Sequence, residues 1–162
     1  MERIFYFAYG SNMNQEDLDR YCQKNGNNKI PLNERNPRKA VLKDYELVFN
    51  YYSSTRGGGA ANIEPKTGSS VEGVVFDLTE DEFEIIRKKE GAPNYYKEKI
   101  VSVYIEGSPV QVYTFQVTEG KKEDVIQFPT QKYINIIIEG AKEFSLSDAW
   151  IKKLKKIPVK SS

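Results

Sequence analysis

The feature that most constrains the fold is a pair of strand-like segments that follow each other almost without a gap. Residues 95–107 (YYKEKIVSVYIEG) and 108–117 (SPVQVYTFQV) are rich in β-branched and aromatic residues, which favour strands. Gly107 and Ser108 lie where the two segments meet, and a short glycine-containing link of this kind is typical of a tight β-hairpin. The chain is therefore expected to contain antiparallel strands.

Strands and helices alternate along the rest of the chain. A polar stretch rich in Asn, Gly and Pro, residues 23–40, predicts a loop. Strands are expected at 3–8, 40–52, 60–63 and 71–78, and helices at 14–23, 79–91, 131–144 and 145–157. With 162 residues the chain suits a single domain, 1–162, and the mixture predicts an α+β fold with a sheet or a small barrel.

Charge and hydropathy exclude several kinds of partner. The formal net charge is +1, so the chain carries no signature of a nucleic-acid or membrane-surface binder. No apolar window is long enough for a membrane span. Five lysines near the C-terminus predict a solvated helix face: Lys152, Lys153, Lys155, Lys156 and Lys160. We expect no nucleic-acid and no membrane partner, and the sequence leaves a homodimer open.

Two residue counts limit the chemistry. The single cysteine, Cys22, excludes an internal disulfide and fits a cytoplasmic protein. The chain has no histidine, which excludes Ser-His-Asp and Cys-His nucleophilic sites and nearly every zinc site. Catalysis would have to use carboxylates, tyrosines, lysines, hydroxyls or backbone amides, and we expect no metal site.

Within the helix expected at 79–91, one carboxylate lies on the face predicted to be buried. Thr79 and Glu82 form a capping-box pattern, and Gly91 is a stop signal. Phe83 and Ile86 mark the buried face, and the next position on that face is Glu90. Burial raises the pKa of a carboxyl group, which would suit Glu90 to general acid–base catalysis near pH 7. The alternative is that the helix end frays and Glu90 turns towards water.

A second candidate feature is the loop between the first strand and the first helix, FAYGSNM at residues 7–13. Gly10 allows backbone to approach a ligand closely, and Ser11, Asn12 or Asn14 can cap the helix that follows. Such a loop could hold a carboxylate or the oxyanion formed when an amide carbonyl is attacked, although a plain turn and cap would look the same. An anion-holding loop and a buried acid together suit an amide reaction in which the substrate supplies its own nucleophile.

The chain resembles the AIG2-like γ-glutamylcyclotransferase family over most of its length. YFAYGSNM at 6–13 matches the signature loop of that family, and KKEGAPNYY at 88–96 matches the segment that carries its catalytic glutamate. GGAANI at 58–63, VEGVVFDL at 71–78 and the helical residues 133–157 resemble further blocks. The resemblance implies a small mixed β-barrel flanked by helices, and cofactor-free release of 5-oxoproline from γ-glutamyl compounds.

The resemblance also implies roles for particular residues. Glu90 would take a proton from the substrate's α-amine and return it to the leaving nitrogen, and Tyr133 would line the pocket. The spacing leaves either Tyr96 or Tyr95 to hydrogen-bond near the acid. The substrate-binding loop implied by the resemblance consists of Tyr6, Phe7, Ala8, Tyr9, Gly10, Ser11 and Asn12.

The loop sequence YGSNM differs from the YGSL and YGTL of the glutathione-specific and γ-glutamylamine branches, which favours γ-glutamyl amino acids as substrates. The alternative function is a small-molecule binding module that keeps the pocket without catalysis.

Overall fold

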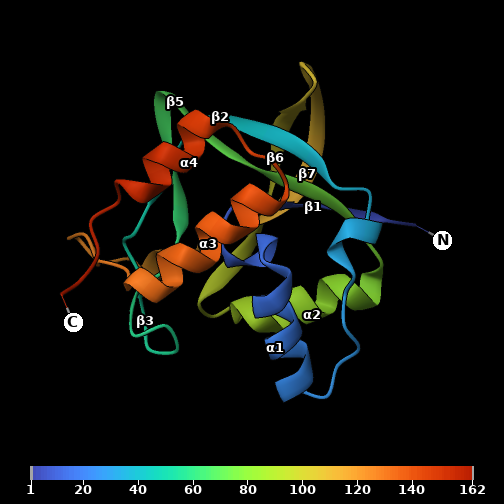
Figure 1. Cartoon of the computed structure of the whole chain (residues 1–162), viewed down its shortest axis with the longest axis horizontal. Helices are drawn as coiled ribbons and strands as arrows, with labels where there is room; N and C mark the ends of the chain where they lie inside the picture. Colours follow the sequence, from blue (N-terminus) through green and yellow to red (C-terminus); the bar gives the residue numbers. More distant parts are fainter. Residues whose placement is uncertain (1, 162) are drawn as a thin grey trace.

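The structure, a computed structural model, describes residues 2–161 and is built on a closed barrel of five strands (Figure 1). The strands follow the order β1-β5-β2-β6-β7, and only β1 and β7 are parallel neighbours. This is the small mixed barrel that the resemblance implied. The five strands are β1 (Ile4–Ala8), β2 (Arg38–Val48), β5 (Asn62–Leu78), β6 (Tyr96–Ile105) and β7 (Ser108–Val117).

The expected hairpin is present as β6 and β7, with its turn one residue earlier than predicted. The two strands pair from Tyr96 opposite Val117 to Ile105 opposite Ser108. Glu106 and Gly107 form the turn, with φ angles of 49° and 81°. Two positive φ values are what a tight hairpin turn needs to match the twist of its strands, which explains why glycine stands at one of them.

The two separate strands expected at 60–63 and 71–78 are in fact one strand, β5. Its pairing with β2 shifts register between Lys43, which pairs with Ser70, and Tyr45, which pairs with Pro65. The residues between Pro65 and Ser70 are the polar and glycine residues that suggested a break. Asp44 has a φ of 64°, and its carboxylate accepts a hydrogen bond of 2.9 Å from the amide of Gly68. The irregularity therefore bends the paired strands without ending them.

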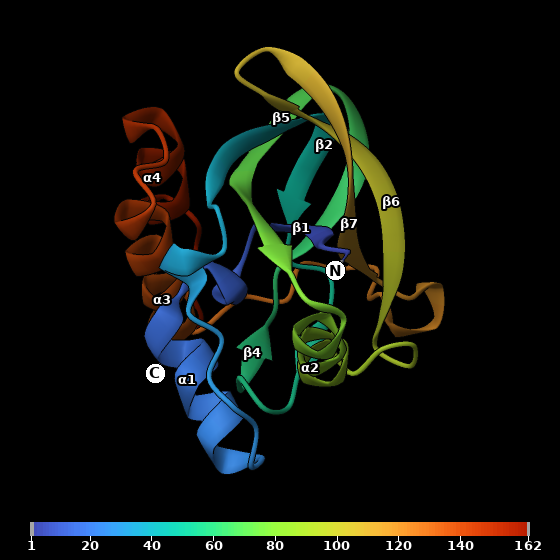
Figure 2. The same ribbon diagram turned by 90° about the vertical axis from the view of Figure 1, so that its right-hand side faces the viewer.

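Four α-helices flank the barrel: α1 (Gln15–Lys24), α2 (Glu80–Glu90), α3 (Gln131–Glu143) and α4 (Asp148–Lys155). Figure 2 shows α1, α3 and α4 along one side of the barrel and α2 below it. Each helix begins after a side chain that accepts a hydrogen bond from its first turn, namely Asn14, Thr79, Thr130 and Ser147. The capping box of Thr79 and Glu82 is complete, as the sequence predicted.

Short elements complete the chain. A 3-10 turn, η1 (Ser11–Met13), connects β1 to α1, and a two-stranded ribbon is formed by β3 (Tyr52–Ser53) and β4 (Gly58–Gly59). Two more 3-10 turns are η2 (Leu32–Glu34) and η3 (Glu119–Lys121). No helix within residues 2–161 is both long and apolar enough to cross a membrane.

Packing around β1 fixes the position of the loop that follows it. The ring of Phe83, on α2, is fully buried, and its centroid lies 6.0 Å from that of Tyr6 and 5.7 Å from that of Phe115. On the other side, Gly140 of α3 faces Met13 so closely that an added Cβ would lie 2.8 Å from the Met13 carbonyl carbon. The loop is therefore held between the barrel, α2 and α3.

Candidate active site

A narrow cavity lies where the loop after β1 meets the end of α2. The residues that line it come from five segments of the chain: Tyr6, Tyr9, Gly10, Ser11, Asn12, Ala61, Glu90, Tyr96 and Tyr133. Every predicted site residue except Phe7 and Ala8 is in this set, and Ala61 is an addition. The structure thus brings the predicted acid and the predicted loop together.

Phe7 and Ala8 are buried but do not line the cavity. Side chains alternate along a strand, so Phe7 points to the face of β1 opposite Tyr6. Its ring packs beside Gly73 of β5, where an added Cβ would lie 2.7 Å from a ring carbon and 2.3 Å from the Ala8 carbonyl oxygen. These two residues build the wall of the barrel behind the site.

The structure also separates the two tyrosines that the sequence left as alternatives. Tyr95 is 46% exposed and lies outside the set that lines the cavity, whereas Tyr96 is 7% exposed and lines it. The Tyr96 hydroxyl donates a hydrogen bond of 2.7 Å to the carbonyl oxygen of Ala61. Tyr96, the first residue of β6, thereby ties this strand to the residue that precedes β5.

Glu90 is the last residue of α2, and Gly91 ends the helix with a left-handed φ of 67°. The residue as a whole is half-buried, but its carboxyl group faces the cavity. Burial raises the pKa of this carboxyl, although the charges of Lys89 and Arg56 act in the opposite direction. Among the described residues the Glu90 carboxyl has no hydrogen-bond or ion-pair partner, so it is free to exchange a proton with a ligand.

The four tyrosines that line the cavity are held in their neutral form. Burial raises the pKa of each, that of Tyr133 to about 12. Their hydroxyl groups at neutral pH are therefore hydrogen-bond donors and acceptors and carry no charge.

Three charged residues behind the cavity were not found by sequence reasoning. The Lys89 ammonium lies 3.2 Å from an Asp17 carboxylate oxygen, and both side chains are only 6% exposed. Arg56 donates two hydrogen bonds of 2.9 Å to the same carboxylate. The contacts with Arg56 and Lys89 overcome the effect of burial and lower the pKa of Asp17 to about 2.

The cavity has a volume of about 20 Å³, room for about one water molecule.

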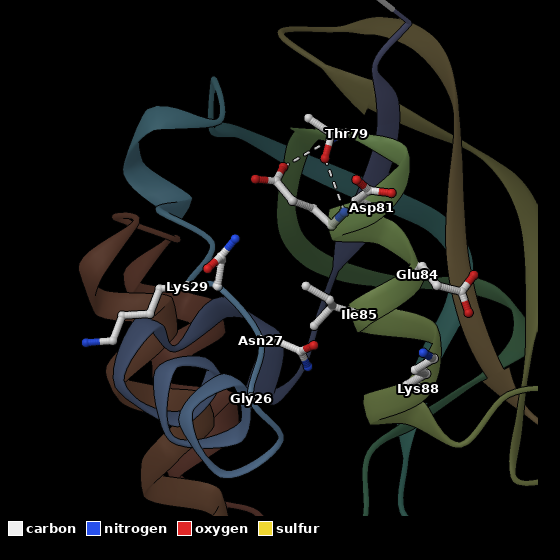
Figure 3. Close-up of a pocket in the computed structure, with 10 residues that line it drawn as sticks. Gly26, Asn27, Lys29, Thr79, Asp81, Glu84, Ile85 and Lys88 are labelled. Carbon is white, nitrogen blue, oxygen red and sulfur yellow. Dashed lines mark hydrogen bonds between the residues drawn. The ribbon is translucent and has the colours of Figure 1, made fainter.

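A larger hollow of about 500 Å³ lies elsewhere, between the segment after α1 and helix α2 (Figure 3). Lys29 and Lys88 line it together with Asp81 and Glu84. It contains none of the predicted site residues, and we do not assign it a role in catalysis.

No group of three or more metal-ligating side chains occurs within residues 2–161.

Comparisons with known proteins agree with this arrangement. The chain is 30% identical to the γ-glutamylcyclotransferase of Bos taurus over 167 aligned positions, which cover 96% of this chain and 79% of the bovine protein. It is 29% identical to the protein of the same name from Homo sapiens, with the same coverage. A solved structure named γ-glutamyl cyclotransferase superposes with a TM-score of 0.80 at 27% identity, covering 99% of this chain and 91% of the other.

The family described as "Gamma-glutamyl cyclotransferase, AIG2-like" matches residues 6–135, which include the loop, Glu90, Tyr96 and Tyr133. Since the match spans most of the chain, this protein belongs to the AIG2-like γ-glutamyl cyclotransferase family.

Proposed function

We propose that this protein is a γ-glutamylcyclotransferase that releases 5-oxoproline from γ-glutamyl amino acids or amines. The relatives that it matches carry this name. In this reaction the α-amine of the substrate attacks its own γ-carbonyl carbon, a five-membered lactam forms, and the bond to the leaving nitrogen breaks.

Glu90 acts in this scheme as the general acid and base. The α-amine reacts in its neutral form, after the proton of its ammonium form has gone to solvent. It must lose a further proton as its bond to the γ-carbon forms, and the ionised Glu90 carboxylate accepts it. The neutral carboxyl then gives the proton to the leaving nitrogen, so the proton is conserved over the cycle. A carboxyl with a raised pKa suits both steps near neutral pH.

The loop after β1 and the tyrosine-lined walls hold the γ-glutamyl group. Gly10, Ser11 and Asn12 line the same cavity as the acid and bind the glutamyl moiety, together with Tyr96 and Tyr133. Holding the glutamyl chain curled lowers the entropic part of the barrier, since the reacting amine and carbonyl already belong to one molecule.

The observation that carries this proposal is the position of Glu90. Its carboxyl has no partner among the described residues and shares one cavity with the loop. A buried carboxylate with a purely structural role would be paired with a cation or bonded to backbone amides.

The test is an assay for 5-oxoproline over a panel of γ-glutamyl amino acids and γ-glutamyl amines, with the wild-type protein and Glu90→Gln. We expect turnover by the wild type and none by Glu90→Gln, which keeps the shape of the side chain and loses the base. Glu84→Gln is the matched control, because Glu84 lies on the outer face of α2 and pairs with Arg87. Turnover by Glu90→Gln at the wild-type rate would remove Glu90 from the mechanism.

The same panel tests the second candidate, a binding module. If the wild type binds γ-glutamyl compounds in calorimetry and forms no 5-oxoproline from any of them, the protein is a binder.

The YGSNM loop leads us to expect γ-glutamyl amino acids as the best substrates. The free, buried Cys22 suits a reducing compartment such as the cytoplasm.

A further inference from the structure

The four cavity tyrosines differ in how their hydroxyl groups are bonded. Tyr9 and Tyr96 donate their hydroxyl hydrogens to backbone carbonyl oxygens, those of Phe115 at 2.6 Å and Ala61 at 2.7 Å. The hydroxyl of Tyr6 instead accepts a hydrogen bond of 2.9 Å from Nδ2 of Asn12. Its own hydrogen has no acceptor within residues 2–161, so it is available to a ligand in the cavity.

The direction of the Asn12 amide is set by Lys89. The Lys89 ammonium lies 2.8 Å from Oδ1 of Asn12, and an ammonium group can only donate, so the oxygen of the amide must face it. The amide nitrogen of Asn12 is then left to donate to Tyr6. The remaining contacts of the ammonium are with Asp17 at 3.2 Å and the Ser11 hydroxyl at 3.4 Å, which hold it in place.

We propose that Tyr6 donates its hydroxyl hydrogen to the γ-carbonyl oxygen of the substrate, and that Lys89 is a positioning residue that aims it through Asn12. This inference rests on the proposed function and adds a donor and a relay to it. The chain of contacts runs from Asp17 to Lys89, Asn12 and Tyr6, and each partner polarises the next.

The role of Tyr6 follows from the charge that develops during the reaction. When the α-amine bonds to the γ-carbon, the carbonyl oxygen gains negative charge, and that charge is lost again when the leaving nitrogen departs. A fixed donor at this oxygen stabilises the transition state more than the ground state. Burial raises the pKa of Tyr6 well above 10, so the hydroxyl keeps its proton and donates a hydrogen bond only.

Among the four cavity tyrosines, Tyr133 is the other one whose hydroxyl hydrogen has no acceptor within residues 2–161, since its oxygen accepts a hydrogen bond of 3.1 Å from the Ala61 amide. Tyr6 is the better candidate for the donor to the γ-carbonyl oxygen. Its own donor partner, Asn12, is bonded to the Lys89 ammonium, and this charge strengthens the hydrogen bond from Asn12 to Tyr6 and the one that Tyr6 donates.

The first arm of the test is Tyr6→Phe, which keeps the ring against Phe83 and removes the hydroxyl. We expect kcat for 5-oxoproline formation to fall roughly 100-fold with little change in KM. Tyr113→Phe is the matched control, because Tyr113 lies on β7 outside the cavity and is 36% exposed; its kcat should equal that of the wild type. A wild-type kcat in Tyr6→Phe would overturn the inference.

The second arm is a double-mutant cycle with Lys89→Met, or Lys89→Gln if the methionine variant does not fold. Lys89→Met alone should lower kcat on the order of tenfold, because the Asn12 amide is free to rotate. If Lys89 acts through Tyr6, the double variant has the kcat of Tyr6→Phe alone. Effects on kcat that multiply would overturn the role of Lys89.

Failure of this inference can be told from failure of the proposed function. A wild-type protein that makes no 5-oxoproline refutes the function itself. An active wild type together with an equally active Tyr6→Phe refutes only the role of Tyr6 as hydrogen-bond donor.

Discussion

Arg56 and Asp17 form a two-pronged ion pair, with Nη1–Oδ1 and Nη2–Oδ2 distances of 2.9 Å. The guanidinium of Arg56 also lies over the ring of Tyr133, 5.1 Å from its centroid. Asp17 belongs to α1 and Arg56 to the loop between β3 and β4, so the pair joins two segments behind the cavity. With Lys89 of α2 as its second cation, Asp17 holds three separate segments together.

Replacing Asp17 with Asn should therefore cost much more stability than a surface change. The substitution leaves two cations near each other with no compensating charge, and breaking a buried pair costs about 3 to 5 kcal/mol. Urea unfolding measures this loss. Glu16→Gln on the same helix is the control: Glu16 is 81% exposed in its pair with Arg20, so we expect little change. Equal losses in both variants would contradict the central role of Asp17.

The depressed pKa of Asp17 predicts where acid weakens the fold. The folded value is about 2 and the ordinary value 3.8, so the contribution of Asp17 is fully present above pH 3.8 and is lost as the pH falls to about 2. Melting temperatures of the wild type should fall across this range, and those of Asp17→Asn should fall less. Parallel curves would show that Asp17 does not titrate in this way.

Glu90→Gln should make the protein more stable at neutral pH while abolishing turnover. The pKa of Glu90 is raised, so ionisation costs more in the folded state than in the unfolded chain. The wild type therefore loses stability as the pH rises from 4.5 through the raised folded value, and the Gln variant does not. The difference in melting temperature should be near zero at pH 4 and positive at pH 8. A variant less stable than the wild type at pH 8 would contradict a desolvated carboxylate.

The rate of 5-oxoproline formation should depend on pH in the same range. Glu90 must be ionised to accept the proton of the α-amine, so kcat/KM should fall on the acid side with an apparent pKa above the ordinary 4.5 of a glutamate. Steady-state rates between pH 4 and 9 give this profile. An acid limb at or below pH 4.5 would mean that Glu90 is not desolvated in the free enzyme.

Gly140→Ala should lower activity through the loop, although alanine is the better helix former by about 1 kcal/mol. The new Cβ would lie 2.8–2.9 Å from backbone and side-chain atoms of Met13, at the end of the turn that forms the cavity. We expect kcat/KM to fall roughly tenfold, since the loop must shift. Gly120→Ala is the control, because no atom lies within 4 Å of its added Cβ. Wild-type kinetics in Gly140→Ala would show that the loop tolerates displacement.

The sequence predicted those parts of the fold and site that depend on local signals. Thr79, Glu82 and Gly91 marked the ends of α2, whereas the spacing from Phe83 and Ile86 left Glu90 open between the buried face and a frayed helix end. The break expected between residues 63 and 71 was wrong, because polar and glycine residues that usually end a strand here form an irregularity held by Asp44.

The charged group behind the cavity could not be predicted from the sequence. Asp17 lies in the acidic first turn of α1 and Lys89 in the basic last turn of α2, where such charges are usual on solvated helix ends. Arg56 stands in a glycine-rich loop. Only the fold brings these three distant segments into contact, and a single sequence contains no signal of that proximity.

The lack of a partner for the Glu90 carboxyl among the described residues has a consequence for how the active site would exchange protons with the solvent. A lone acid that receives and returns the same proton ends every cycle in the ionisation state in which it began. For a substrate whose α-amine enters in its neutral form, such a site needs no relay to bulk water, and its turnover should be indifferent to the concentration and identity of the buffer.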